Sequence, residues 1–122
     1  MVSNAVFRTL ALQFENCSEA PHFEKTSFRV KNKIFASLDE KNNRAVIKLD
    51  AINQSVFSAY DKNVIHPVEG AWGRQGWTMV ELSKVRKDLL KDALSVAYEL
   101  LVQKKTGNKS GKKTKRFTNT SG

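Results

Sequence analysis

The chain has 122 residues, of which 40% are hydrophobic and 27% are charged, and its formal net charge is +9. This size and composition fit one small soluble domain and exclude a collagen-like, coiled-coil or disulfide-rich protein. No apolar run approaches the roughly 20 residues that span a bilayer, so we expect no membrane contact, and the single cysteine, Cys17, favours a reducing cytoplasmic location.

The positive charge is concentrated at the C-terminal end of the chain. Residues 104–122 hold seven of the 21 basic residues and no acidic residue, which leaves fourteen basic against twelve acidic residues in 1–103. The tail is rich in Gly, Ser, Thr, Asn and Lys, so it cannot bury enough apolar surface to offset the entropy of ordering. We therefore expect a single folded domain over residues 1–103 and a disordered basic tail over residues 104–122.

The N-terminal part of the chain predicts one helix followed by three strands. Four apolar residues share one face of a helix over residues 3–15, which Ser3 can cap, and residues 16–21 are predicted as a loop. Apolar residues then alternate with polar ones in three segments that are separated by tight polar turns at residues 31–33 and 39–43. This alternation predicts an antiparallel meander of three strands.

A short helix and an extended segment are predicted next. Asp50 can cap a helix over residues 51–60, which we expect to bury Ile52, Val56 and Phe57. Pro67 lacks the amide hydrogen that an inner strand donates, so the segment around it is expected to be an edge strand or an extended loop.

The remaining elements are a glycine-rich turn at residues 70–76, a strand at residues 77–82 and a long helix from Ser83 to about Lys104. The apolar face of this helix is broad enough to pack across a sheet. The order of helix, strands, helix, strands and helix predicts an α+β fold with an antiparallel β-sheet and helices packed on one face.

Catalytic and metal-binding patterns are absent from the sequence. His22 and His66 lie in different segments, no His, Cys, Asp or Glu spacing supports a zinc site, and no phosphate-binding glycine loop or nucleophile motif occurs. Cys17 has no partner motif and is interpreted as an inert thiol. We expect a protein with no enzymatic activity, no metal and no cofactor.

Two sets of residues are candidates for binding. The first lies in the segment Gly70–Thr78, where Trp72, Arg74 and Gln75 could stack on bases or bind phosphates, although Trp72 and Trp77 could equally belong to the core. The second is the basic side of the predicted meander, which could follow a phosphate backbone or could be an ordinary solvated surface. Its members are Arg29, Lys31, Lys33, Arg44 and Lys48.

Several short segments, in this order and spacing, resemble the MmcQ/YjbR family of small bacterial proteins over about residues 7–102. They are His22-Phe23, Phe28-Arg29-Val30, Lys33-Ile34-Phe35-Ala36, Ala45-Val46-Ile47-Lys48-Leu49, Pro67-Val68 and Gly70-Ala71-Trp72-Gly73-Arg74-Gln75-Gly76-Trp77-Thr78. The resemblance implies an α+β fold and a proposed DNA-binding role through a double wing. The wings would be the turn at residues 31–33 or that at residues 39–44, together with the glycine-rich segment.

The leading hypothesis is a monomeric bacterial binding module for DNA, in which the basic residues contact phosphates and Trp72 stacks or wedges. The alternative is a module that uses the segment from Trp72 to Trp77 to bind a small ligand or a protein partner. Because residues 1–103 carry almost no net charge, the spatial arrangement of their basic residues decides between DNA binding and the alternative.

Overall fold

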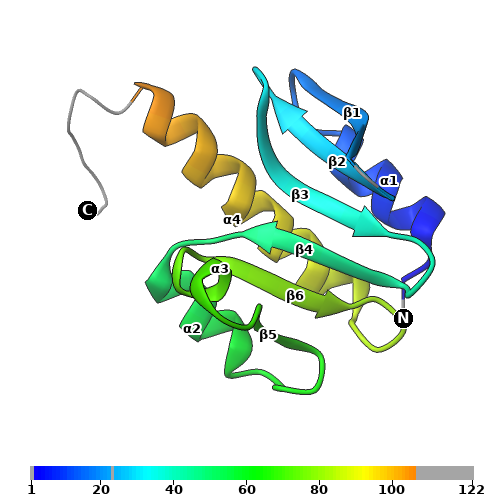
Figure 1. Cartoon of the computed structure of the whole chain (residues 1–122), viewed down its shortest axis with the longest axis vertical. Helices are drawn as coiled ribbons and strands as arrows, with labels where there is room; N and C mark the ends of the chain where they lie inside the picture. Colours follow the sequence, from blue (N-terminus) through cyan, green and yellow to red (C-terminus); the bar gives the residue numbers. More distant parts are fainter. Residues whose placement is uncertain (1, 23, 107–122) are drawn as a thin grey trace.

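The computed structural model describes residues 2–22 and 24–106, which form four helices and six strands (Figure 1). The elements in chain order are α1 (Asn4–Leu12), β1 (Cys17–His22), β2 (Lys25–Val30), β3 (Lys33–Asp39), β4 (Arg44–Lys48), α2 (Ala51–Ser58), β5 (Ile65–Pro67), α3 (Ala71–Arg74), β6 (Trp77–Glu81) and α4 (Lys87–Thr106). The predicted α+β fold is therefore confirmed.

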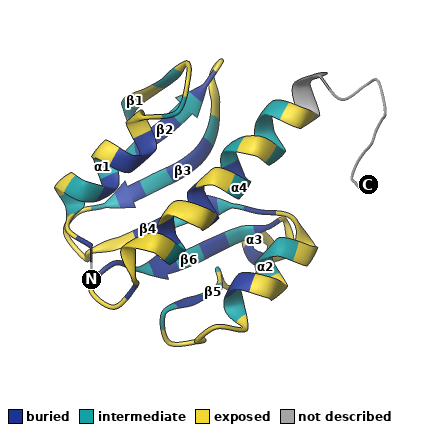
Figure 2. Cartoon of the chain, turned by 180° about the vertical axis from the view of Figure 1, so that it is seen from behind, coloured by how far each residue is buried: buried dark blue, intermediate teal, exposed yellow. Residues whose placement is uncertain are grey.

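The six strands form one antiparallel sheet in the order β1-β2-β3-β4-β6-β5. Figure 1 shows α4 behind the sheet, and Figure 2 shows α1 and α4 in front of it when the molecule is seen from the other side. The helix α2 lies on the same side, because Gln54 donates a hydrogen bond to Thr78, whose buried side chain alternates with the outward-facing Trp77 and Met79. Thus α1, α2 and α4 cover one face of the sheet, and they leave the other face uncovered.

The hydrophobic core lies between the helices and the covered face of the sheet. Phe28, Ile47, Val80 and Leu94 are fully buried there, and Phe7 of α1 meets Phe28 of β2 edge-on at a ring separation of 5.5 Å. Strand residues that point inward alternate with partly exposed ones, as the sequence pattern predicts for a sheet with one wet face.

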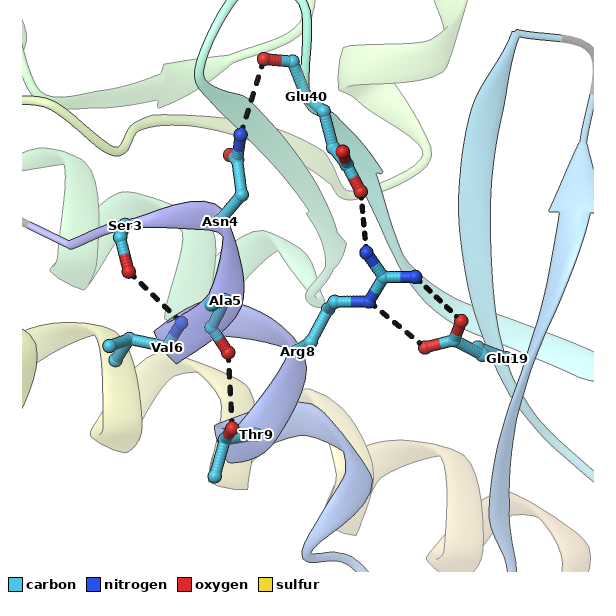
Figure 3. Close-up of polar contacts among 8 residues, drawn as sticks. All are labelled: Ser3, Asn4, Ala5, Val6, Arg8, Thr9, Glu19 and Glu40. Carbon is cyan, nitrogen blue, oxygen red and sulfur yellow. Dashed lines mark hydrogen bonds and ion pairs between the residues drawn. The ribbon is translucent and has the colours of Figure 1, made fainter.

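An ion pair on the surface attaches α1 to two parts of the sheet (Figure 3). The Arg8 guanidinium contacts Glu19 of β1 at 2.8 Å and Glu40, in the turn after β3, at 2.7 Å. Asn4 also donates a hydrogen bond to the Glu40 carbonyl, and Ser3 caps the helix by accepting the amide of Val6, as predicted. Two segments far apart in the sequence are thereby held against the first helix.

The pair predicts a pH-dependent contribution to stability. The hydrogen bond from Arg8 lowers the pKa of Glu19 below its ordinary value. A carboxylate whose pKa is lowered on folding stabilises the native state above its unfolded pKa, roughly 4.3, and this contribution is lost as the pH falls through the lower folded value. Glu19→Gln should therefore reduce the free energy of unfolding at pH 7 and have little effect near pH 2. Denaturant titrations at pH 7 and pH 2 measure the free energy of unfolding, with Glu24→Gln as the control. An equal loss of stability at the two pH values would show that the ion pair is not its cause.

Three differences from the sequence-based expectations concern β1, the start of α4 and the buried side of α2. Residues 17–22, expected as a loop apart from His22, form the edge strand β1, and an edge position tolerates Pro21 because an outward-facing backbone needs no donor. The last helix begins at Lys87, after turn hydrogen bonds from Lys84 and Val85 to the Glu81 carbonyl. The third difference is in α2 and concerns which side of that helix is buried.

The expected burial of α2 is correct for Phe57 and wrong for Ile52 and Val56. The helix has the predicted Asp50 cap, and Phe57 is buried, but Ile52 and Val56 are exposed to solvent. Apolar residues occur on both sides of this helix, so their spacing does not decide which side meets the sheet. The hydrogen bonds of Gln54 fix the orientation of the helix, because its side-chain amide donates to the carbonyls of Gly73 and Trp77.

The helix α4 continues to Thr106, so it includes three residues that the sequence assigns to the tail. Residues 107–122, which make up the rest of the predicted tail, lie outside the described part of the chain. Across the residues that are described, no helix is both long and apolar enough to cross a membrane.

Candidate functional site

A cleft opens where β3 and β4 separate. The two strands pair only from Ala36 to Asp39 on β3, so the start of β3 pairs with β2 alone, and the register between β2 and β3 shifts there at Phe28 and Arg29. The C-terminal half of α4 is visible in the wedge between the two strands (Figure 1). The cleft has a volume of about 650 Å³, which lies within the usual range of roughly 300–1,000 Å³ for small-molecule sites.

The cleft combines an apolar interior with a polar rim. The residues from α4 are Ala97, Leu100, Leu101 and Gln103. Those from β3, β4, the start of α2 and the end of α3 are Lys33, Ile34, Phe35, Lys48, Leu49, Asp50, Ala51 and Gln75. Phe35 is held in place by Phe14 and Tyr98, whose rings lie 6.0 Å from its own. The apolar interior is therefore rigidly backed by core packing, whereas the rim carries two ammonium groups, one carboxylate and two amides.

The glycine-rich segment borders this cleft and folds as a one-turn helix, α3, where a turn was expected. Its glycines allow close backbone approach: a Cβ atom at Gly73 would overlap the carbonyl of Val68, and one at Gly76 would overlap the carbonyl of Leu49. Gln54 joins α2 to the same segment through its bond to the Gly73 carbonyl. Glycine is required here by internal packing, so these glycines need no ligand to explain them.

An aromatic and basic corner lies beside the cleft. The rings of Trp72 and Trp77 are 6.1 Å apart, and the Lys48 ammonium lies 6.0 Å from the Trp77 ring. Trp77 is half-buried on the open face of the sheet, whereas Trp72 keeps 61% of its surface exposed. An exposed indole beside a packed one offers a flat apolar surface for a planar ligand.

The structure brings together only some of the residues that the sequence suggested. Lys33, Lys48 and Gln75 line the cleft, Trp72 touches Trp77 at its border, and Lys31 lies in the exposed turn beside β3. Arg74 is exposed at the end of α3.

Two other candidates do not join this group. Arg44 lies at the opposite end of β4, where its side chain forms an ion pair with Glu81 at 3.1 Å. Arg29 lies on the uncovered face of the sheet and donates a hydrogen bond to Ser27 at 2.9 Å. The turns at residues 31–33 and 39–43 are at opposite ends of β3, so they cannot both border the glycine-rich segment.

The sequence did not indicate the contribution of α4 to the cleft. Leu100 and Leu101 are half-buried at its interior, and Gln103 lies on its rim. The one available signal was the width of the apolar face of α4, which exceeds what contact with the sheet alone requires.

Cys17, His66 and the potential metal ligands are the other reactive groups of the described residues. Burial raises the pKa of the Cys17 thiol above its ordinary value, which agrees with the inert thiol expected from the sequence. The His66 ring lies 3.1 Å from the Pro67 carbonyl. Within 2–22 and 24–106, no three His, Cys, Asp or Glu side chains come together as metal ligands would.

The fold and cleft define a small α+β protein with one sheet, one helix-covered face and a cleft between the sheet and its last helix. The model of the YjbR family matches residues 12–100, so the chain belongs to the YjbR family, as the sequence resemblance indicated. The chain is also similar to the crystal structure of protein DR2400 of Deinococcus radiodurans, a DUF419 domain, with a TM-score of 0.73 and 24% identity over 87% of this chain and 82% of that one. A search of curated proteins gives no match.

Proposed function

We propose that this protein is a non-enzymatic cytoplasmic binding module and that the cleft between β3, β4 and α4 binds a small anion with an apolar body. The observation that carries the proposal is the placement of Lys33 and Lys48 on the rim of an apolar cleft of about 650 Å³. Clefts of this kind, with an apolar lining and a few placed polar groups, are the usual form of a ligand site.

The chemistry of the lining selects the ligand class. Leu100 and Leu101 offer apolar surface to the ligand body, and the two lysines favour an anionic group at the opening. Asp50 is the one carboxylate on the rim, and its oxygen already accepts the Asn53 backbone and side-chain amides. The electrostatic balance at the opening therefore favours an anion over a cation.

A pair of fluorescent probes tests this proposal. The full chain is titrated with 8-anilinonaphthalene-1-sulfonate and with its neutral analogue N-phenyl-1-naphthylamine, and dodecanoate is used as a competitor. We expect the sulfonate to bind more tightly than the neutral probe and to be displaced by dodecanoate but not by dodecanol. Equal affinities for the two probes would show that the lysines do not select an anion.

Nucleic-acid binding, without duplex sequence readout, is the second candidate. It is supported by the exposed indole of Trp72, which contacts Trp77 beside Lys48 and lies on the same short helix as the exposed Arg74. Aromatic side chains next to basic ones bind single strands by stacking on bases and pairing with phosphates. The nearly neutral charge of residues 1–103 argues for single strands over a long duplex footprint.

The expected result for this second candidate is a specific loss on removal of one ring. Trp72→Ala should weaken single-stranded oligonucleotide binding by about 5- to 150-fold, the effect of roughly 1–3 kcal/mol of stacking. The comparison is made by fluorescence anisotropy in a full chain whose seven basic residues from Lys104 to Arg116 are replaced by glutamine. If binding disappears with those replacements alone, the C-terminal residues and not the domain bind the nucleic acid.

A further inference from the structure

The outer side of α2 exposes a stripe of large apolar residues. Ile52, Val56 and Tyr60 are 75%, 51% and 67% exposed, and they follow one another at intervals of four residues along the helix and its C-terminal turn. Phe57, on the other side, is buried against the protein. In Figure 2, α2 lies at the edge of the molecule, with no described element over its outer side.

A second stripe, of small residues, runs beside the first. Ala51, Ser55 and Ala59 are all exposed and have the same four-residue spacing. No charged residue occurs between 51 and 60. A water-facing helix surface without charge is uncommon in a soluble monomer and marks an interaction surface.

The two stripes are complementary to themselves. A two-fold axis between residues 55 and 56 would set a second copy of α2 antiparallel to the first. Each large residue of one copy then meets a small residue of the other, with Ile52 opposite Ala59, Val56 opposite Ser55 and Tyr60 opposite Ala51. Ridges that fill grooves in this way allow helices to approach closely, and a two-fold contact uses the same surface twice.

The charges at the ends of α2 agree with antiparallel pairing. Asp50 precedes the helix, and Lys62 follows its C-terminal turn. In the paired arrangement, Lys62 of each copy approaches Asp50 of the other. Lys62 also offsets the negative charge of the neighbouring Asp61, whose carboxylate accepts the Asn63 amide. A partner of unrelated sequence would not be expected to match both the stripe spacing and these end charges.

We propose that the outer face of α2, consisting of residues 51, 52, 55, 56, 59 and 60, is a self-association surface that binds a second copy of this chain. The patch consists of three exposed large apolar side chains and three small ones, which is much less than the roughly 20–30 residues, or about 800 Å², that each partner contributes to a standard stable interface. The dimer is therefore weak and reversible. This state differs from the monomer expected from the sequence.

Sedimentation of the full chain over micromolar to millimolar concentrations tests the proposal. The average mass should rise from 13.8 kDa toward twice that value as the concentration increases. Val56→Glu should remain monomeric throughout, because it places two carboxylates at the two-fold axis. Leu12→Glu is the matched control, since Leu12 is a partly exposed apolar residue on α1, and it should associate as the unmodified chain does.

Cross-linking then tests the geometry of pairing. In a Cys17→Ser background, Ser55→Cys should form an intermolecular disulfide on mild oxidation, because residue 55 lies next to the proposed axis. Ser95→Cys, at an exposed position on α4, should not. The proposal is overturned if the chain is monomeric at all concentrations or if the dimer cross-links equally at residues 55 and 95. A monomer would mean that the exposed stripe binds a partner of another sequence.

Discussion

Gly76→Ala and Gly73→Ala should each prevent cooperative folding, whereas Gly70→Ala should only weaken it. A Cβ atom at Gly76 would overlap the carbonyl of Leu49, and Gly76 also has a φ of +107°, which side-chain-bearing residues rarely adopt. At Gly73 the overlap is with the Val68 carbonyl. Both obstacles are backbone atoms, so a side-chain rotation cannot relieve them.

The position of these carbonyls explains the size of the expected effect. Leu49 donates its amide to the Gly76 carbonyl at 2.9 Å, and Val68 donates its amide to Trp77 at 3.0 Å, so both obstacles belong to segments that are hydrogen-bonded beside β6. Moving them would disrupt that end of the sheet. We expect losses above about 4 kcal/mol, the range reserved for severe single substitutions and comparable with the whole stability of a small domain.

Gly70 is the matched control within the same segment. Its φ of +79° and ψ of −153° make alanine unfavourable by roughly 1–3 kcal/mol, but a Cβ atom there meets nothing within 4 Å. Thermal unfolding followed by circular dichroism should show a lowered midpoint for Gly70→Ala and no cooperative transition for the other two variants. Equal midpoints for all three would mean that the backbone around α3 can move apart, against the close packing described here.

The meander and the long helix could be predicted because local pattern determines them. Alternating residues in the strands from Phe28 to Leu49 have one buried side, and the turns between them carry Lys31, Asn32 and Asn43 with positive φ. The edge strand β1 was missed because its residues, CSEAPH, lack the β-branched and aromatic types that mark strands. Its pairing with β2 is a tertiary effect that the segment itself does not encode.

The cleft could be predicted only in part. Lys33 and Lys48 were identified as candidates because they are basic, but their common cleft arises where β3 leaves β4 and where α4 passes behind both. Arg44 had the same sequence signal and lies at the far end of its strand, paired with Glu81. The residue types therefore indicated that basic groups could bind an anion. Which of these groups share a cleft depends on the register of the sheet, which the residue types do not reveal.

Charge reversal on the cleft rim should abolish selective binding of the anionic probe. Lys33→Glu should weaken 8-anilinonaphthalene-1-sulfonate binding by at least about 10-fold, since a hydrogen bond to a charged group contributes roughly 1.5–3 kcal/mol and the new carboxylate repels the sulfonate. The neutral probe N-phenyl-1-naphthylamine should lose little. Leu101→Ala should weaken both probes alike, because it removes apolar surface without changing charge.

Lys31→Glu separates a local contact from a general electrostatic effect. Lys31 lies two residues from Lys33, in the exposed turn and outside the cleft lining, so its reversal changes the net charge by the same amount. We expect it to alter sulfonate affinity by less than about 2-fold, because an exposed side chain outside the lining attracts the ligand only through solvent, where salt screens its charge. If Lys31→Glu and Lys33→Glu weaken binding equally, attraction is spread over this end of the molecule and the cleft does not hold the anion. If only Lys33→Glu acts, and acts only on the anionic probe, the rim lysine contacts the charged group of the ligand directly.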